Sequence, residues 1–216
     1  MLKADKINKA LVDAIGAYQA KRYSEAEAGA DRILKQEPLH AGTLQLKALL
    51  ALLRGDLESA QRAVGASLAV RPGHVPTTKI ASQICSARFA VGHQAQEAGR
   101  PAEAIHACRK ALALDVKHPE AWFCLGLALQ DMKDYAGAAE AFGHVVALKP
   151  DDAKAQVNHA ISLQQTGDLD GAFASYRAAY TKDPSTFGAI AQSLAAASTG
   201  LVFLDAERLR DRLIRA

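Results

Sequence analysis

A helical hairpin between Pro119 and Asp152 constrains this chain more than any other feature. One face of its first predicted helix, which ends near Lys133, carries Trp122, Leu125, Gly126 and Leu129 at helical spacing. The second predicted helix carries Ala138, Phe142 and Val145 on one face and ends at Pro150, because proline lacks the backbone N–H that would continue it. Gly126 and Ala138 are small enough to let the two helices approach closely.

The same pattern recurs about 34 residues later and about 34 residues earlier in the chain. The later copy contains Ala160, Leu163, Gly167, Ala172, Tyr176, Ala179 and Pro184. The earlier copy contains Gly92, Gly99, Ala104, Cys108 and Ala111. This order of aromatic, Leu-Gly, Ala, Phe and Pro resembles the tetratricopeptide repeat, a helix-turn-helix unit. The resemblance implies an all-α fold, a right-handed superhelical solenoid of about five units.

The predicted units are residues 7–40, 41–74, 75–118, 119–152 and 153–186, followed by a capping helix at 187–200 and a tail at 201–216. The third unit is about ten residues too long for the period. Helical spacing of Ile80, Ile84, Ala87 and Val91 places this insertion in one long helix from Pro76 to about Ala98. The extra length either packs on neighbouring units or presents Thr77, Thr78, Ile80 and Ile84 to a partner; we favour the first alternative.

The sequence does not decide how the first helix of the first unit aligns with the repeat. A strict repeat puts Asp13 where Leu125 stands in the hairpin described above. A turn shortened by two residues near Lys21 would instead align Ile15 and Gly16 with Leu125 and Gly126. Both alternatives remain at this point.

The tail combines four successive apolar residues, 201–204, with an amphipathic segment from Asp205 to Arg215. Such an apolar run should be buried in this chain, in a second copy or in a partner. We therefore expect that residues 201–216 offer one route to self-association. Arg208, Arg210, Arg212 and Arg215 alternate with acidic residues, so a nucleic-acid partner is not expected.

The start of the chain, its apolar runs and its cysteines predict where in the cell the protein is found. The start, Met1 to Lys6, has no apolar core of a signal peptide, and the sequence contains no run of some 18 apolar residues. Cys85, Cys108 and Cys124 are odd in number and lack CxxC spacing, so we expect buried, reduced packing residues. These features predict a cytoplasmic protein without membrane contact.

No pattern for an enzyme or a metal site stands out, and we expect neither catalysis nor a cofactor. Three of the seven histidines, His40, His74 and His118, recur where one predicted unit turns into the next, which favours a turn role over a ligand role. His93 and Glu97 lie one helical turn apart and could hold a cation, but a solvated edge is the simpler interpretation.

In the tetratricopeptide family the first helix of each unit lines a concave groove that holds a peptide or a helix. Carried over to this chain, the resemblance implies groove positions at Leu49, Leu52, Leu53, Phe89, His93, Gln96, Phe123, Leu127, Gln130, Asn158, Ile161 and Gln165. The same alignment adds Gln45, Glu97, Glu120, Asp131, Lys154, Val157 and Gln164. Such a groove is apolar and aromatic, with amides that can bind a peptide backbone. The Lys, Arg and Asn clamp of chaperone-binding members is missing, so an apolar segment is the expected ligand.

The predicted function is therefore a protein-interaction module or scaffold that binds a peptide or helical segment of a protein partner in this groove. Two alternatives stay open. The array could be an accessory module of a transferase-type enzyme system, or it could assemble with itself through the tail.

Overall fold

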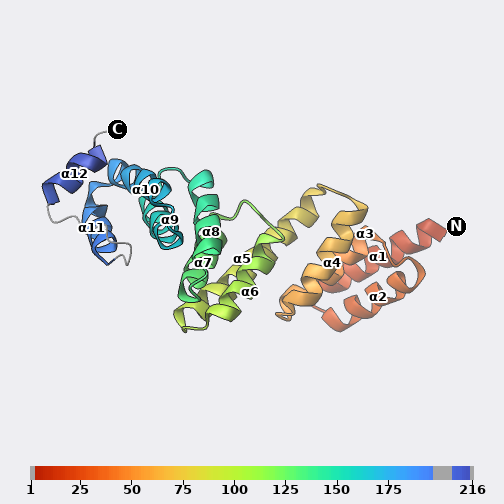
Figure 1. Cartoon of the computed structure of the whole chain (residues 1–216). Helices are drawn as coiled ribbons and strands as arrows, with labels where there is room; N and C mark the ends of the chain where they lie inside the picture. Colours follow the sequence, from red (N-terminus) through yellow and green to blue (C-terminus); the bar gives the residue numbers. More distant parts are fainter. Residues whose placement is uncertain (1–2, 197–205, 215–216) are drawn as a thin grey trace. The chain divides into compact units, whose positions relative to one another are not determined.

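The computed structural model describes residues 3–196 and 206–214, and within these ranges it is helical with no strand (Figure 1). The helices are α1 (Lys3–Gln19), α2 (Tyr23–Gln36), α3 (Ala41–Leu53), α4 (Leu57–Val70), α5 (Val75–Glu97), α6 (Pro101–Leu112), α7 (Pro119–Asp131), α8 (Tyr135–Leu148), α9 (Ala153–Thr166), α10 (Leu169–Lys182), α11 (Phe187–Ala195) and α12 (Ala206–Ile214), with a 3-10 turn at Pro184–Thr186. The predicted all-α helical repeat solenoid is confirmed. The handedness of its superhelix and the bounds of its repeat units stay predictions.

The chain divides into two compact units, residues 1–88 and 89–216, and the division falls inside α5. In the first unit α1 packs on α2, α2 on α3 and α3 on α4. In the second unit each helix from α6 to α10 packs on the next, and α12 packs on α10. The candidate site described below lies wholly within the second unit.

One backbone turn joins the two helices of every hairpin. It contains a residue in the left-handed region, with φ between 59° and 88°, at Lys21, Gly55, Gly99, Lys133 and Gly167. The next residue caps the second helix, and at Asp56, Asp134 and Asp168 its carboxylate accepts a 3.0 Å hydrogen bond from a backbone N–H three residues on. Arg22 and Arg100 occupy the same position and pair instead with Glu25 and Glu103, at 2.7 Å in each case.

This turn decides the register of the first unit. Lys21 and Lys133 both have positive φ, so α1 follows the strict repeat. Ala14 and Ala17 are consequently buried, whereas Asp13 and Gly16 are exposed. The alternative with the shortened turn is not formed.

The junctions between hairpins use the histidines as expected. His118 Nδ1 accepts a hydrogen bond from the Ala121 N–H at 3.2 Å and so caps α7. His40 occupies the N-cap position of α3 without a side-chain hydrogen bond to the helix backbone, and its Nδ1 lies 2.8 Å from Thr43 Oγ1. The His74 ring contacts the hydroxyl of Thr77 at 3.2 Å, at the start of α5. The predicted turn role of these three histidines is confirmed.

A small residue on the first helix faces the second helix in each hairpin. Gly126 lies against the fully buried ring of Phe142, and a Cβ at position 126 would come within 2.7 Å of that ring. Gly92 lies in the same way against the sulfur of Cys108. Ala14, Ala48 and Ala160 are the buried residues at this position in the other hairpins. Helix spacing is therefore set by these small residues, as the sequence predicted.

The long helix of the third unit is α5, and its bounds agree with the predicted ones to within one residue at each end. Thr77, Ile80 and Ile84 are buried, so the intramolecular alternative is confirmed for them. The Thr77 hydroxyl accepts a hydrogen bond from the Gln45 amide on α3 and lies 3.4 Å from the hydroxyl of Ser67 on α4.

The C-terminal end of the second unit is covered twice. Ile190 and Leu194 of α11 are buried against the hairpin of α9 and α10, as expected for a capping helix. Leu209 and Leu213 of α12 enter the same core, while Arg210 lies over the Phe187 ring at 4.5 Å. Residues 206–214 of the predicted tail thus pack on their own chain. The apolar run 201–204 and Asp205 lie outside the described residues.

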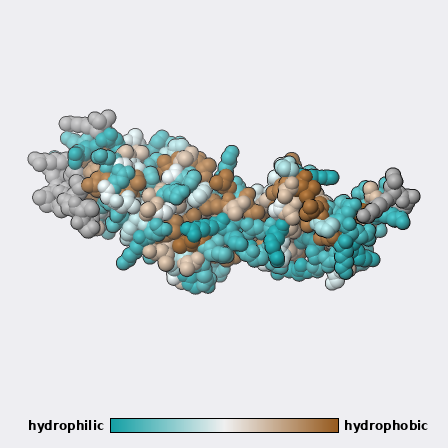
Figure 2. Space-filling view, turned by 45° about the vertical axis from the view of Figure 1, so that its right-hand side comes forward, coloured by the Kyte–Doolittle hydropathy of each residue, from teal (hydrophilic) through white to brown (hydrophobic). Residues whose placement is uncertain are grey.

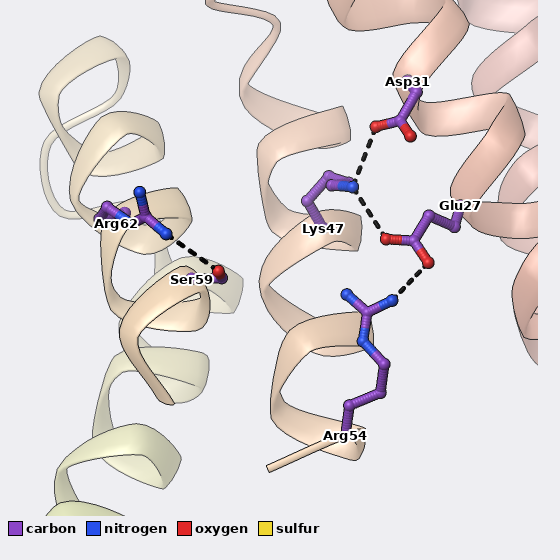
Figure 3. Close-up of polar contacts among 6 residues, drawn as sticks. All are labelled: Glu27, Asp31, Lys47, Arg54, Ser59 and Arg62. Carbon is purple, nitrogen blue, oxygen red and sulfur yellow. Dashed lines mark hydrogen bonds and ion pairs between the residues drawn. The ribbon is translucent and has the colours of Figure 1, made fainter. Parts of the chain in front are cut away.

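An ion-pair network joins α2 to α3 (Figure 3). Lys47 Nζ lies 3.0 Å from Glu27 Oε1 and 2.9 Å from Asp31 Oδ1, and Arg54 pairs with the other oxygen of Glu27. Hydrogen bonds from Arg54 and Lys47 lower the pKa of Glu27 below its ordinary value of 4.5. On α4, Arg62 donates a 3.1 Å hydrogen bond to Ser59 (Figure 3).

The contact between Gly126 and Phe142 gives a first prediction. Gly126→Ala should lower the free energy of unfolding by about 1 to 3 kcal/mol, because the new methyl group overlaps the Phe142 ring. In Gly126→Ala/Phe142→Leu the overlap is relieved, so the loss should be smaller than the sum of the two single losses. Urea unfolding followed by circular dichroism measures all three. Strict additivity would contradict the proposed contact.

The Glu27 network gives a second prediction, on pH. Because the pKa of Glu27 is lowered in the folded state, its contribution is present above pH 4.5 and is lost as pH falls through the folded pKa. Glu27→Gln should therefore cost up to about 1 kcal/mol of unfolding free energy near pH 7 and clearly less near pH 3.

Urea unfolding at both pH values measures the difference between Glu27→Gln and the wild type. Glu140→Gln, at an exposed glutamate with no ion-pair partner in the described ranges, is the matched control and should change little at either pH. A cost for Glu27→Gln that persists unchanged at pH 3 would rule the network out.

Candidate protein-interaction surface

A pocket of about 420 Å³ opens on the second unit, and we call it the α5–α7–α9 pocket. It is lined by Phe89, His93, Gln96 and Glu97 of α5, by Pro119, Glu120, Phe123, Cys124 and Leu127 of α7, by Val145 and Lys149 from α8 and its end, and by Asp152 and Lys154 at the start of α9. Five of the twelve predicted groove residues meet there: Phe89, His93, Gln96, Phe123 and Leu127.

The apolar wall of this pocket is aromatic. Phe123 stands edge-to-face against the buried Phe142 with 5.4 Å between ring centroids, so one side of its ring is anchored in the core. Phe89 lies 5.3 Å from the His118 ring and 5.8 Å from the His93 ring, again between centroids. Phe89, Phe123 and Leu127 all remain partly exposed. On the face drawn in Figure 2, hydrophobic residues reach the surface among hydrophilic ones.

Several charged groups at the pocket already have partners within it. Lys149 Nζ lies 2.5 Å from Glu120 Oε1, and this hydrogen bond lowers the pKa of Glu120 below its ordinary value. Asp152 caps α9 by accepting a 2.9 Å hydrogen bond from the Ala155 N–H. Lys154 Nζ lies over the Phe123 ring, 5.2 Å from its centroid.

The amides predicted to bind a ligand backbone are used inside the protein. Gln96 Nε2 donates to Asp131 Oδ2 of α7 at 2.5 Å, and Gln130 Nε2 donates to Ser162 Oγ of α9 at 2.9 Å. Asn158 donates to the Lys154 carbonyl at 2.9 Å. The first two bonds tie α5 to α7 and α7 to α9, whereas the Asn158 bond lies within α9.

The remaining predicted groove residues lie outside the pocket. Leu49, Leu52 and Leu53 belong to α3 in the first unit, where Leu53 is 54% exposed. Ile161 packs partly against the C-terminal core, and Gln165 is exposed. All twelve predicted residues are at least partly exposed, and their role in a groove stays a prediction.

The prediction is wrong for Val157 and Gln164, which are only 7% and 2% exposed. Gln164 accepts a hydrogen bond from the buried Tyr176 hydroxyl at 2.9 Å and donates to the Ser193 carbonyl at 3.1 Å. Burial raises the pKa of Tyr176 to about 12, so this hydroxyl stays a donor at neutral pH.

Sequence reasoning also missed part of the pocket wall. Val145 and Lys149 come from the second helix of a hairpin and its end, which the family pattern does not assign to the groove. In the sequence, only the position of Lys149 next to Pro150, at the end of the predicted helix, could have indicated that this residue reaches the pocket.

Other chemistry finds little support in the described part of the chain. No group of three or more His, Cys, Asp or Glu residues there could hold a metal ion. All three cysteines are buried, and a hydrogen bond to Cys124 together with burial raises the pKa of the Cys108 thiol. None of the described helices is both long and apolar enough to cross a bilayer.

Comparison with known proteins identifies the repeats. The sequence profile of the tetratricopeptide repeat matches residues 90–142 and 125–186, which include most of the α5–α7–α9 pocket. Protein FlbA of Caulobacter vibrioides is 26% identical over 195 residues, which cover 79% of this chain and 33% of FlbA. The N-terminal acetyltransferase A complex auxiliary subunit NAA15 of Arabidopsis thaliana is 29% identical over 148 residues, covering 68% of this chain and 15% of NAA15.

This chain thus spans a third or less of each of these two relatives. Among solved structures, the crystal structure of MamA protein aligns with a TM-score of 0.45 at 17% identity, covering 85% of this chain and 94% of that chain. The predicted resemblance is confirmed where the profile matches. Through residues 90–186, the chain belongs to the tetratricopeptide repeat family.

Proposed function

We propose that the α5–α7–α9 pocket binds a peptide or helical segment of a protein partner. The tetratricopeptide repeat fold supports a protein-interaction scaffold in general. The observation that carries the finer proposal is the set of partly exposed apolar side chains, Phe89, Phe123 and Leu127, in one pocket where the Gln96 NH2 group already donates to Asp131. An inserted apolar side chain would bury this surface without breaking any existing hydrogen bond.

The contacts that hold the pocket residues in place strengthen this proposal. Phe123 is held by the Phe142 ring, and the first helices on either side of α7 are tied to it through Gln96 and Gln130. A pocket that is formed before binding loses little side-chain entropy when a ligand arrives. Binding would then gain most of the free energy of apolar burial.

A second candidate is an accessory subunit of a transferase. The printed name of NAA15, an auxiliary subunit of an acetyltransferase complex, favours this alternative over other enzyme associations. The pocket would then receive a segment of the catalytic subunit, so the binding chemistry would be the same. Co-purification with a transferase from the native organism distinguishes this candidate from a general scaffold.

Self-assembly through the tail has a narrower basis. Leu209 and Leu213 are buried in the chain's own core, so α12 does not offer them to a second copy. Within the described part of the tail, Ile214 is 66% exposed and is accessible for such a contact.

The proposed function is tested by selecting peptides from a random display library on the wild-type protein and measuring their Kd on defined variants. Leu127→Lys should weaken binding of the selected peptides at least roughly tenfold, because a charge replaces apolar surface in the pocket lining. Leu39→Lys, the same substitution at a residue 65% exposed and outside this pocket, is the matched control and should leave Kd unchanged.

Circular dichroism and thermal unfolding must be unaltered in both variants, because Leu127 is only partly buried. Equal binding to the wild type and to Leu127→Lys would overturn the proposal. Equal losses in both variants would do the same.

A further inference from the structure

We propose, resting on the proposed function, that the α5–α7–α9 pocket selects a peptide segment with an apolar side chain between opposite charges. An acidic residue of the segment would lie at the Lys154 end, and a basic residue would lie at the Glu97 end. The inference comes from which charged groups at the pocket lack an internal partner.

Three of the five charged groups lining the pocket are already engaged. Lys149 and Glu120 form an ion pair at 2.5 Å, which neutralises both within the pocket. Asp152 accepts the hydrogen bond that caps α9 and lies at the positive end of that helix dipole. These groups have little left to offer a ligand.

Lys154 and Glu97 are different. Among the described residues the Lys154 ammonium has no carboxylate partner, and its contact is the Phe123 ring at 5.2 Å. The Glu97 side chain is 70% exposed, and its Oε2 lies 3.5 Å from His93 Nδ1. This contact is an ion pair only when the His93 ring is protonated. Both charges border the apolar wall, where a ligand that excludes water would strengthen their interactions.

The two charges belong to opposite sides of the pocket. Glu97 is on α5 and Lys154 is on α9, and α7 lies between these helices, hydrogen-bonded to α5 through Gln96 and to α9 through Gln130. The apolar residues Phe123 and Leu127 come from this central helix. A segment crossing α7 would therefore meet a negative charge, an apolar surface and a positive charge in that order.

The charges also disfavour a nucleic acid as the occupant. The pocket lining holds Glu97, Glu120 and Asp152 against Lys149 and Lys154, so it carries no net positive charge with neutral histidine. A phosphate backbone needs several uncompensated cations, and here one lysine is uncompensated. A dipolar peptide satisfies both free charges at once.

Three pools of fluorescein-labelled peptides test the inference. Every peptide has a central Leu, Ile, Met or Phe with one or two Ser residues on either side. The two outer residues, read from the N-terminus, are Lys and Glu in the first pool, Glu and Lys in the second, and Ser at both places in the third. Fluorescence polarisation gives Kd for the wild type, for Glu97→Lys/Lys154→Glu, and for Lys35→Glu/Glu140→Lys, which exchanges the same charge types at exposed positions outside the pocket.

We expect the wild type to prefer one charge order over the other by roughly tenfold. Glu97→Lys/Lys154→Glu should prefer the opposite order, and the control should keep the wild-type preference. Far-ultraviolet circular dichroism checks that both double variants remain folded.

The inference is overturned if the exchanged variant keeps the wild-type order, or if the wild type binds all three pools equally. In the second case, loss of binding in Leu127→Lys would still support the proposed function. If no pool binds the wild type, the proposed function and the inference both fail.

Discussion

The close approach of two helices at a small residue is the interaction on which the rest of this structure depends. Gly126 against Phe142 and Gly92 against Cys108 show how the second helix fills the space that a larger residue on the first would take. Because the same contact position recurs, the two helices within each hairpin pack closely. On the first helices, Phe89, Phe123 and Leu127 are left partly exposed at the surface.

Interhelical hydrogen bonds also order the second unit. The amides of Gln96 and Gln130 each reach the next first helix, and the buried Gln164 continues the pattern to the Ser193 carbonyl of the capping helix. Removing the partner of the buried Gln164 would leave a buried polar group unsatisfied, which is costly. The hydrogen bonds of Gln96 and Gln130 thus hold α5, α7 and α9 side by side and keep the pocket formed without a ligand.

The repeat period alone predicted the helices, the long α5 and the turn role of the histidines, because each depends on local spacing. It could not settle the first unit, where Lys21 adopts the left-handed conformation that glycine provides at position 55. For the site, it found the partly exposed wall at Phe89, Phe123 and Leu127. It failed at Val157 and Gln164, since their burial depends on the capping helix, and at Lys149, which reaches the pocket from the end of a second helix.

The most direct test of this account is where a bound peptide touches the protein. Intermolecular nuclear Overhauser effects between a selected peptide and protein with labelled Leu methyl groups and Phe rings report these contacts. The account predicts effects from the peptide's apolar side chain to the Leu127 methyl groups and to the Phe89 and Phe123 rings. Effects confined to the first unit, or to the helices α6 and α10, would contradict it.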